Sequence, residues 1–186
     1  MPEKGYDQAA TSLLDTLLNT VWQHGAIAHQ YLKDTAEGDG FLDDYSSFGQ
    51  ALLEGFLLTV NSMYLERAHE LAERIERVFP FEGDFRVYSP AVDAAWQKQL
   101  EIEDNVIPCA NSMWAHFYQS MGTIADRNDW KEQAHQALRT VHSKVFRYGP
   151  NFSNWLELGL MRAYGAKELV ITGSGAKAAA EDLQRT

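Results

Sequence analysis

Six helical segments of this chain alternate between two kinds, and the alternation restricts the fold more than any other feature. In one kind, apolar residues form a single stripe and charged residues occupy the opposite side. In the other kind, apolar residues occur on almost every side. A helix that is apolar on most sides must be covered on most sides, whereas an amphipathic helix covers a neighbour with one face. The alternation therefore predicts helical hairpins, each with an inner helix shielded by an outer one.

The spacing of the apolar residues gives the approximate bounds of the elements. Amphipathic, outer helices are expected at about 7–22, 64–79 and 130–146, and largely apolar, inner helices at about 43 or 44 to 60, 112–125 and 153–164. Extended segments are expected at 26–32, 85–88 and 168–172, a polar loop around Gly38 and Gly40, a helical turn within 91–100, and an Ala-rich helical tail after Gly175. The sequence thus predicts an all-α fold of helical hairpins with one or two short strands.

Charge and composition limit the partners of the chain. Its 186 residues fit one domain, its formal net charge is −10, and no block of Lys or Arg occurs. Nucleic acids and anionic membranes require clustered cations, so neither is an expected partner. Cys109 is the only cysteine, which excludes an internal disulfide. The N-terminal residues lack the apolar core of a secretion signal and no apolar run reaches about 20 residues, so the chain is expected to be soluble and cytoplasmic.

Five segments occur in an order that matches one protein family. They are GFLDDYSSFGQALLEGF (40–56), YLERAHELAERI (64–75), DNVIPCANSMWAHFYQSMG (104–122), YGPNFSNWLELGL (148–160) and ELVITG (168–173). Together they resemble the C-terminal helical region of the spermatogenesis-associated, thioredoxin-domain-containing protein family. The resemblance extends from about Ala9 to Gly173. It implies a fold similar to the six-hairpin (α/α) toroids of N-acylglucosamine 2-epimerases and many glycosidases.

Two departures from this family change what can be expected. The family's thioredoxin-like domain and its cysteine motif are absent, so no thiol redox chemistry is carried over. The chain also has room for about three helical hairpins rather than six, given helices of about 12 residues and their loops. Residues 1–186 are therefore expected to form a single partial domain, about half of an (α/α)6 toroid and a fragment of a longer protein. Its exposed inner helices would require the missing remainder of the toroid or a homo-oligomeric partner.

The inner helices begin with polar residues, which have two interpretations. Asp, Asn and Ser satisfy the free N–H groups at helix starts, so capping alone explains the pattern. In a toroid, however, these helix ends gather around one mouth, where a ligand pocket lies. The residues at positions that match the family's motifs are the candidates for a substrate-binding pocket: Asp44, Tyr45, Asn111 and Ser112.

Carboxylates and histidines supply the candidate chemistry. A glycosidase needs two carboxyl groups about 5–9.5 Å apart, and the pair that the sequence offers is Asp44 with Glu103 or Asp104. Solvation of loop acids is the simpler explanation of these residues. A sugar epimerase needs a base that titrates near neutral pH. His29, beside an extended segment, and His116, on an inner helix, are the candidates, with a structural role in the core as the alternative for His116.

Three hypotheses for function follow. The first is a carbohydrate-related α/α-toroid domain that binds sugar and is not a complete enzyme by itself. The second is a non-catalytic scaffold whose apolar inner face docks a partner domain or a second copy. The third is a sugar epimerase or isomerase. No cofactor is implied, and no spacing of His, Cys, Asp or Glu indicates a metal site.

Overall fold

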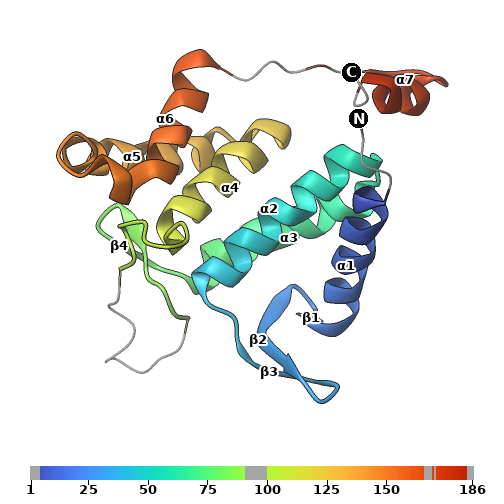
Figure 1. The fold of residues 1–186 in the computed structure, drawn as a ribbon, viewed down its shortest axis with the longest axis horizontal. Helices are drawn as coiled ribbons and strands as arrows, with labels where there is room; N and C mark the ends of the chain where they lie inside the picture. Colours follow the sequence, from blue (N-terminus) through green and yellow to red (C-terminus); the bar gives the residue numbers. More distant parts are fainter. Residues whose placement is uncertain (1–4, 91–99, 166–168, 170, 184–186) are drawn as a thin grey trace.

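The computed structural model describes residues 5–90, 100–165, 169 and 171–183, and most of these residues are helical (Figure 1). The helices are α1 (Tyr6–Thr20), α2 (Leu42–Thr59), α3 (Ser62–Val78), α4 (Ala110–Ile124), α5 (Asn128–Val145), α6 (Ser153–Tyr164) and α7 (Ala176–Leu183), with a 3-10 turn at Gly149–Phe152. The strands are β1 (Trp22–Gln23), β2 (Ala26–Leu32), β3 (Thr35–Asp39), β4 (Phe81–Glu82) and β5 (Phe85–Arg86). All six predicted helices of the hairpins are confirmed, with ends that differ by a few residues.

The strands form two small antiparallel sheets, and the structure has more strands than the sequence predicts. One sheet has the order β1-β2-β3, with Leu32 opposite Thr35, and the other pairs β4 with β5. The predicted polar loop around Gly38 is wrong, because Thr35–Asp39 pairs with β2 as strand β3. The helical turn predicted within 91–100 lies outside the described residues, apart from Leu100. The predicted strand at 168–172 is described only in part, and Leu169, Ile171 and Thr172 are not in a strand.

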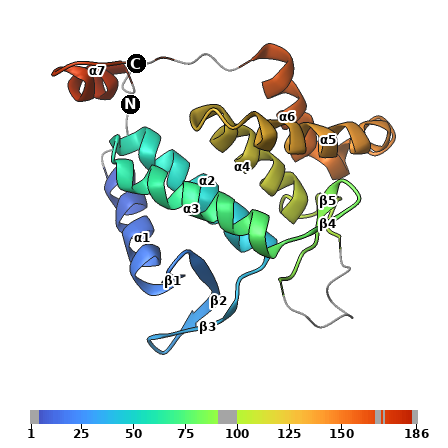
Figure 2. The same ribbon diagram turned by 180° about the vertical axis from the view of Figure 1, so that it is seen from behind.

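Helices α2, α4 and α6 lie next to one another in that order, and α3 and α5 cover them from behind in the view of Figure 1. In this arrangement α3 contacts both α2 and α4, and α5 contacts both α4 and α6, while α1 packs on α2. Figure 2 shows the same layer from the side of α3 and α5. The alternation of inner and outer helices in the sequence therefore corresponds to the order of contacts in space.

The core lies between these helices and is rich in aromatic side chains. Fully buried rings come from α4, α5 and α6, with Trp114 and Tyr118 packed at 5.2 Å and Tyr118 and Trp130 at 5.5 Å between ring centroids. Helices α2 and α4 approach closely at Gly49, where a Cβ atom would lie 2.5 Å from the ring of Phe117. Tryptophans at helical spacing thus fill the core, as their size favours.

Helix α4 is buried on most sides, as predicted for an inner helix, whereas the end of α2 and the whole of α6 are buried on one side only, which corrects the prediction for these two. Helix α2 buries Leu52 and Leu53 but exposes Leu57 and Leu58 near its end. Helix α6 buries Trp155 and Leu158 and exposes other apolar residues, namely Leu156, Leu160, Met161 and Tyr164. The layer of inner helices therefore has an open apolar side within the part of the chain that the structure describes. Among these residues, no helix is both long and apolar enough to cross a membrane.

Candidate functional site

The N-terminal end of α2 carries the residues that the structure gathers into a candidate site. The backbone N–H of Leu42 donates to the carbonyl of Tyr88 at 2.9 Å, which holds the start of α2 against the segment after β5. Asp43 and Asp44 occupy the first turn, where carboxylates interact favourably with the helix dipole. Because β2 passes beside this turn, side chains from three separate parts of the chain meet here.

Asp44 both caps α2 and pairs with a histidine. Its Oδ2 accepts a hydrogen bond from the backbone N–H of Phe41 at 2.8 Å and lies 2.7 Å from Nδ1 of His29. The two side chains are partly accessible, with 46% of His29 and 26% of Asp44 exposed. The ring of His29 also packs edge-on against Phe41, with centroids 4.7 Å apart. Two of the predicted site residues are therefore in direct contact, in an Asp–His pair of the kind that orients a general base.

A polar hollow of about 560 Å³ lies next to this turn. Its wall includes Asp43 from α2, Tyr88 after β5, Glu101 and Glu103 from the segment before α4, and Lys144 near the end of α5. The ring of Tyr88 stacks on Phe41, with centroids 4.9 Å apart and an angle of 10° between the planes. The hydroxyl of Tyr88 donates to Oδ2 of Asp43 at 3.3 Å. Phe41 thus lies between the Asp44–His29 pair and the hollow.

Two carboxyl groups of the hollow are made harder to ionise by their surroundings. Burial raises the pKa of Asp43, and the neighbouring charge of Asp44 raises it further. Burial also raises the pKa of Glu101, with repulsion from Asp43 as the second cause. The pKa of Tyr88 is raised by burial and by these carboxylates, so its phenol stays protonated and acts as a donor. A carboxyl pair of this kind can bind hydroxyl groups or exchange protons with them.

Asn111 and Ser112, which the family motif suggests as pocket residues, are buried and bonded within the protein. The side-chain oxygen of Asn111 accepts from the backbone N–H of Arg86 at 2.8 Å, and its amide group donates to the carbonyls of Arg86 and Glu101 at 3.0 Å each. Both residues are fully buried. Asn111 therefore joins β5 and the segment at 101 to the start of α4 and does not line the hollow.

Ser112 belongs to a buried network centred on Asp104. Oδ1 of Asp104 accepts from the Ser112 hydroxyl at 2.9 Å and from the backbone N–H of Cys109 at 3.0 Å, and Oδ2 accepts from the backbone N–H of Asn154 at 2.9 Å. The amide group of Asn154 donates in turn to the Ser112 hydroxyl. Asp104 thus binds the starts of α4 and α6 together rather than serving as a ligand-facing acid.

Tyr45 and His116 also have structural contacts. Tyr45 is buried, its hydroxyl accepts from the backbone N–H of Ile27 at 3.1 Å, and its ring packs edge-on against Phe79. Nε2 of His116 donates to the carbonyl of Asn154 at 2.7 Å, which ties α4 to the start of α6. Neither side chain lines the hollow at Asp43.

Cys109 stands at the start of α4 and is not an exposed nucleophile. Its side chain is buried, its sulfur accepts from the backbone N–H of Ser112 at 3.4 Å, and burial raises the pKa of its thiol to about 11. Across the ranges that the structure describes, no group of three or more His, Cys, Asp or Glu side chains has the geometry of a metal site.

Comparisons of the chain with protein-family models and with curated proteins find no match.

The sequence indicates this end of α2 and one acid of the hollow, Glu103, but not the other residues of the hollow. Asp44 and His29 are among its candidates, whereas Asp43, Tyr88 and Glu101 are not paired by any sequence spacing. Glu101 is one of three acids within four residues, of which Asp104 is buried, Glu101 is partly buried and Glu103 is exposed. The sequence feature that could have indicated Glu101 is this cluster of acids in an irregular segment, which packs against the starts of two helices.

Proposed function

We propose that this chain is a sugar-binding helical domain of the α/α-toroid type, with its ligand site in the hollow beside the first turn of α2. One observation carries the proposal: Asp43 and Glu101, from distant parts of the sequence, face the same hollow, and repulsion from Asp43 contributes to the raised pKa of Glu101. A pair of carboxyl groups, at least one of them with a raised pKa, is the central element of sites that act on glycosidic bonds.

The remaining wall of the hollow suits a sugar. Carboxylates accept hydrogen bonds from hydroxyl groups, the hydroxyl oxygen of Tyr88 can accept one while it donates to Asp43, and Lys144 supplies donors. The volume of about 560 Å³ lies within the range typical of small-molecule sites. The stacked rings of Phe41 and Tyr88 add an apolar surface beside the polar groups.

The Asp44–His29 pair supplies a candidate proton acceptor on the other side of Phe41. Because Oδ2 of Asp44 holds Nδ1 of His29, the second ring nitrogen becomes the basic one when the imidazole is neutral. This pair and the hollow are the two parts of the site that a sugar of more than one ring would contact together. Binding is the proposed activity of the chain, and proton transfer would require both parts.

The helix order supports the toroid part of the proposal. Inner helices α2, α4 and α6 run side by side, and each outer helix α3 and α5 bridges two of them. This contact order is the one that successive hairpins of an (α/α) ring have, and the resemblance to the thioredoxin-domain-containing family implies the same arrangement. Three hairpins correspond to about half of such a ring.

Saturation-transfer difference NMR with glucose, N-acetylglucosamine and maltose tests the proposal on the full chain. At least one of these sugars is expected to show transfer from the protein. Asp43→Asn and Glu101→Gln are each expected to remove it, since each substitution takes away a carboxylate acceptor without a change of size. Glu157→Gln, on the exposed surface of α6, is the matched control and should leave the transfer intact.

The dependence on pH gives a second readout. Because the pKa values of Asp43 and Glu101 are raised, binding should weaken on acidification at a pH above that of ordinary carboxyl groups. The absence of transfer for all three sugars, or equal transfer to the wild type and to both variants, would reject the hollow as a sugar site.

A further inference from the structure

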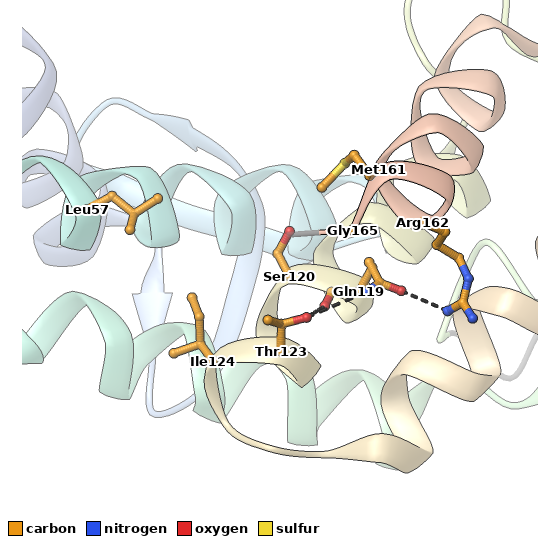
Figure 3. A pocket seen from close by; sticks show the side chains of 8 residues that line it. All are labelled: Leu57, Gln119, Ser120, Thr123, Ile124, Met161, Arg162 and Gly165. Carbon is orange, nitrogen blue, oxygen red and sulfur yellow. Dashed lines mark hydrogen bonds between the residues drawn. The ribbon is translucent and has the colours of Figure 1, made fainter. Parts of the chain in front are cut away.

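A second hollow lies at the opposite end of the inner helices, far along α2 from the site at Asp43. It has a volume of about 420 Å³ and is lined by the last turns of α2, α4 and α6 (Figure 3). The lining residues are Leu57, Gln119, Ser120, Thr123, Ile124, Met161, Arg162 and Gly165. We call this hollow the C-terminal groove.

The groove combines apolar side chains with a few polar groups at one side. Leu57, Ile124 and Met161 are 49%, 41% and 39% exposed, which is unusual for large apolar residues on three adjacent helices. Ser120 and Thr123 add hydroxyl groups from α4, and Figure 3 shows Arg162 beside Gln119, across α4 from Leu57. A pocket that is mainly apolar, with few convergent polar groups, is typical of small-ligand sites.

Arg162 is held in place by neutral partners. One of its terminal nitrogens donates to Oε1 of Gln119 at 3.1 Å, and the other donates to Nδ1 of His135 at 2.8 Å. Among the described residues it has no carboxylate within ion-pair distance, unlike Arg67, Arg127 and Arg139. The pKa of His135 is lowered, with burial as the larger cause and the positive charge of Arg162 as the second. A guanidinium group has five N–H donors, so donors remain for an anion.

We propose that the C-terminal groove binds a small amphiphile with one carboxylate and a short aliphatic chain. The carboxylate pairs with Arg162 and with the hydroxyl of Ser120, and the aliphatic chain lies on Leu57, Ile124 and Met161. Charge complementarity selects this class of ligand, because an anionic group satisfies Arg162 and a neutral apolar ligand does not. The site is separate from the sugar site and does not depend on it.

The experiment uses octanoate as the probe, below its micelle concentration, with the methionine methyl groups of the full chain labelled with ¹³C. Octanoate is expected to shift the Met161 signal saturably and to leave the signals of Met63, Met113 and Met121 in place. Arg162→Gln should weaken octanoate binding at least about tenfold, since a charge-assisted contact is lost. Leu57→Glu, at an exposed position, should abolish binding by placing a like charge in the groove.

Two controls separate the alternatives. Arg147→Gln, on an exposed residue outside the groove, should bind octanoate as the wild type does. 1-Octanol, which has the aliphatic chain without the charge, should bind more weakly to the wild type and be insensitive to Arg162→Gln. Equal affinity for 1-octanol and octanoate, a non-saturable response, or equal shifts of all methionines would overturn the proposal. A Met161 signal that changes on dilution of the protein, with no effect of octanoate, would overturn it in favour of a second copy as the occupant.

Discussion

The two ends of the inner helices differ in which side chains they bury and which they expose. At the N-terminal ends of α4 and α6, polar side chains are buried and bonded to one another around Asp104, and the start of α2 is held by the hydrogen bond from Leu42 to Tyr88. At the C-terminal ends, apolar side chains such as Leu57 and Met161 are exposed without cover from the described residues. The same three helices are therefore firmly joined at one end and open at the other.

The difference shows which end carries stability and which end is available for binding. Removal of one partner from a buried polar network lowers the free energy of unfolding strongly, because the other partners stay buried without hydrogen bonds. Replacement of an exposed apolar side chain changes the free energy of unfolding very little, since water already reaches the side chain in the folded state. The sugar site lies between these extremes, because Asp43 and Glu101 are partly buried and retain access to the hollow.

The largest expected effect is that of Asp104→Ala. The substitution leaves two buried donors without their acceptor, namely the N–H groups of Cys109 and Asn154, and takes away one of the two acceptors of the Ser112 hydroxyl. We expect a loss of about 3–5 kcal/mol in the free energy of unfolding, measured by urea denaturation. Glu103→Ala, one residue away and exposed, is the control and should change stability by less than about 0.5 kcal/mol. Similar losses for the two variants would show that the network does not join the helix starts.

The next effect compares two glycines within helices. Gly49→Ala places a Cβ atom 2.5 Å from the ring of Phe117, so α2 and α4 must separate, whereas Gly159→Ala on α6 meets no atom within 4 Å among the described residues. Gly49→Ala should destabilise by about 1–3 kcal/mol through overpacking. Gly159→Ala should stabilise by about 0.5–1 kcal/mol, because alanine has the higher helix propensity. Thermal unfolding of both variants measures these changes. A change in stability of the same sign for the two variants would contradict the close contact of α2 with α4.

The sequence predicts the helices because their apolar residues recur at helical spacing. It misses β3 because the hairpin turn is Lys33-Asp34, with φ values of 50° and 61°, instead of the Asn-Gly pair that usually indicates such a turn. It also does not show which of its candidate residues are accessible. Asn111 and Ser112 match a motif, but whether a polar side chain faces a ligand or a buried backbone depends on distant segments such as β5 and residue 101.

A smaller effect is expected for Glu101→Gln, and it depends on pH. The pKa of Glu101 is raised in the folded chain, so the folded state binds more protons than the unfolded state between the ordinary and the raised pKa. The native glutamate therefore reduces stability as the pH rises through this window, and the penalty is fully present at neutral pH. Glu101→Gln should raise the unfolding temperature at pH 7 and have little effect below the ordinary carboxyl pKa. A gain that is the same at both pH values would exclude the burial of the ionised carboxylate, and its repulsion from Asp43, as the cause.

The smallest expected effect tests the open end. Leu160 on α6 is 57% exposed, and Leu158, two residues earlier, is fully buried. Leu160→Gln should change the free energy of unfolding by less than about 0.5 kcal/mol, because the side chain is largely in water already. Leu158→Gln should cost about 3–5 kcal/mol, since it removes core packing and buries an amide. Urea denaturation at several protein concentrations measures both. A large, concentration-dependent loss for Leu160→Gln would mean that the apolar side of α6 is covered in solution by another copy of the chain, and that the two ends of the helices are equally well packed.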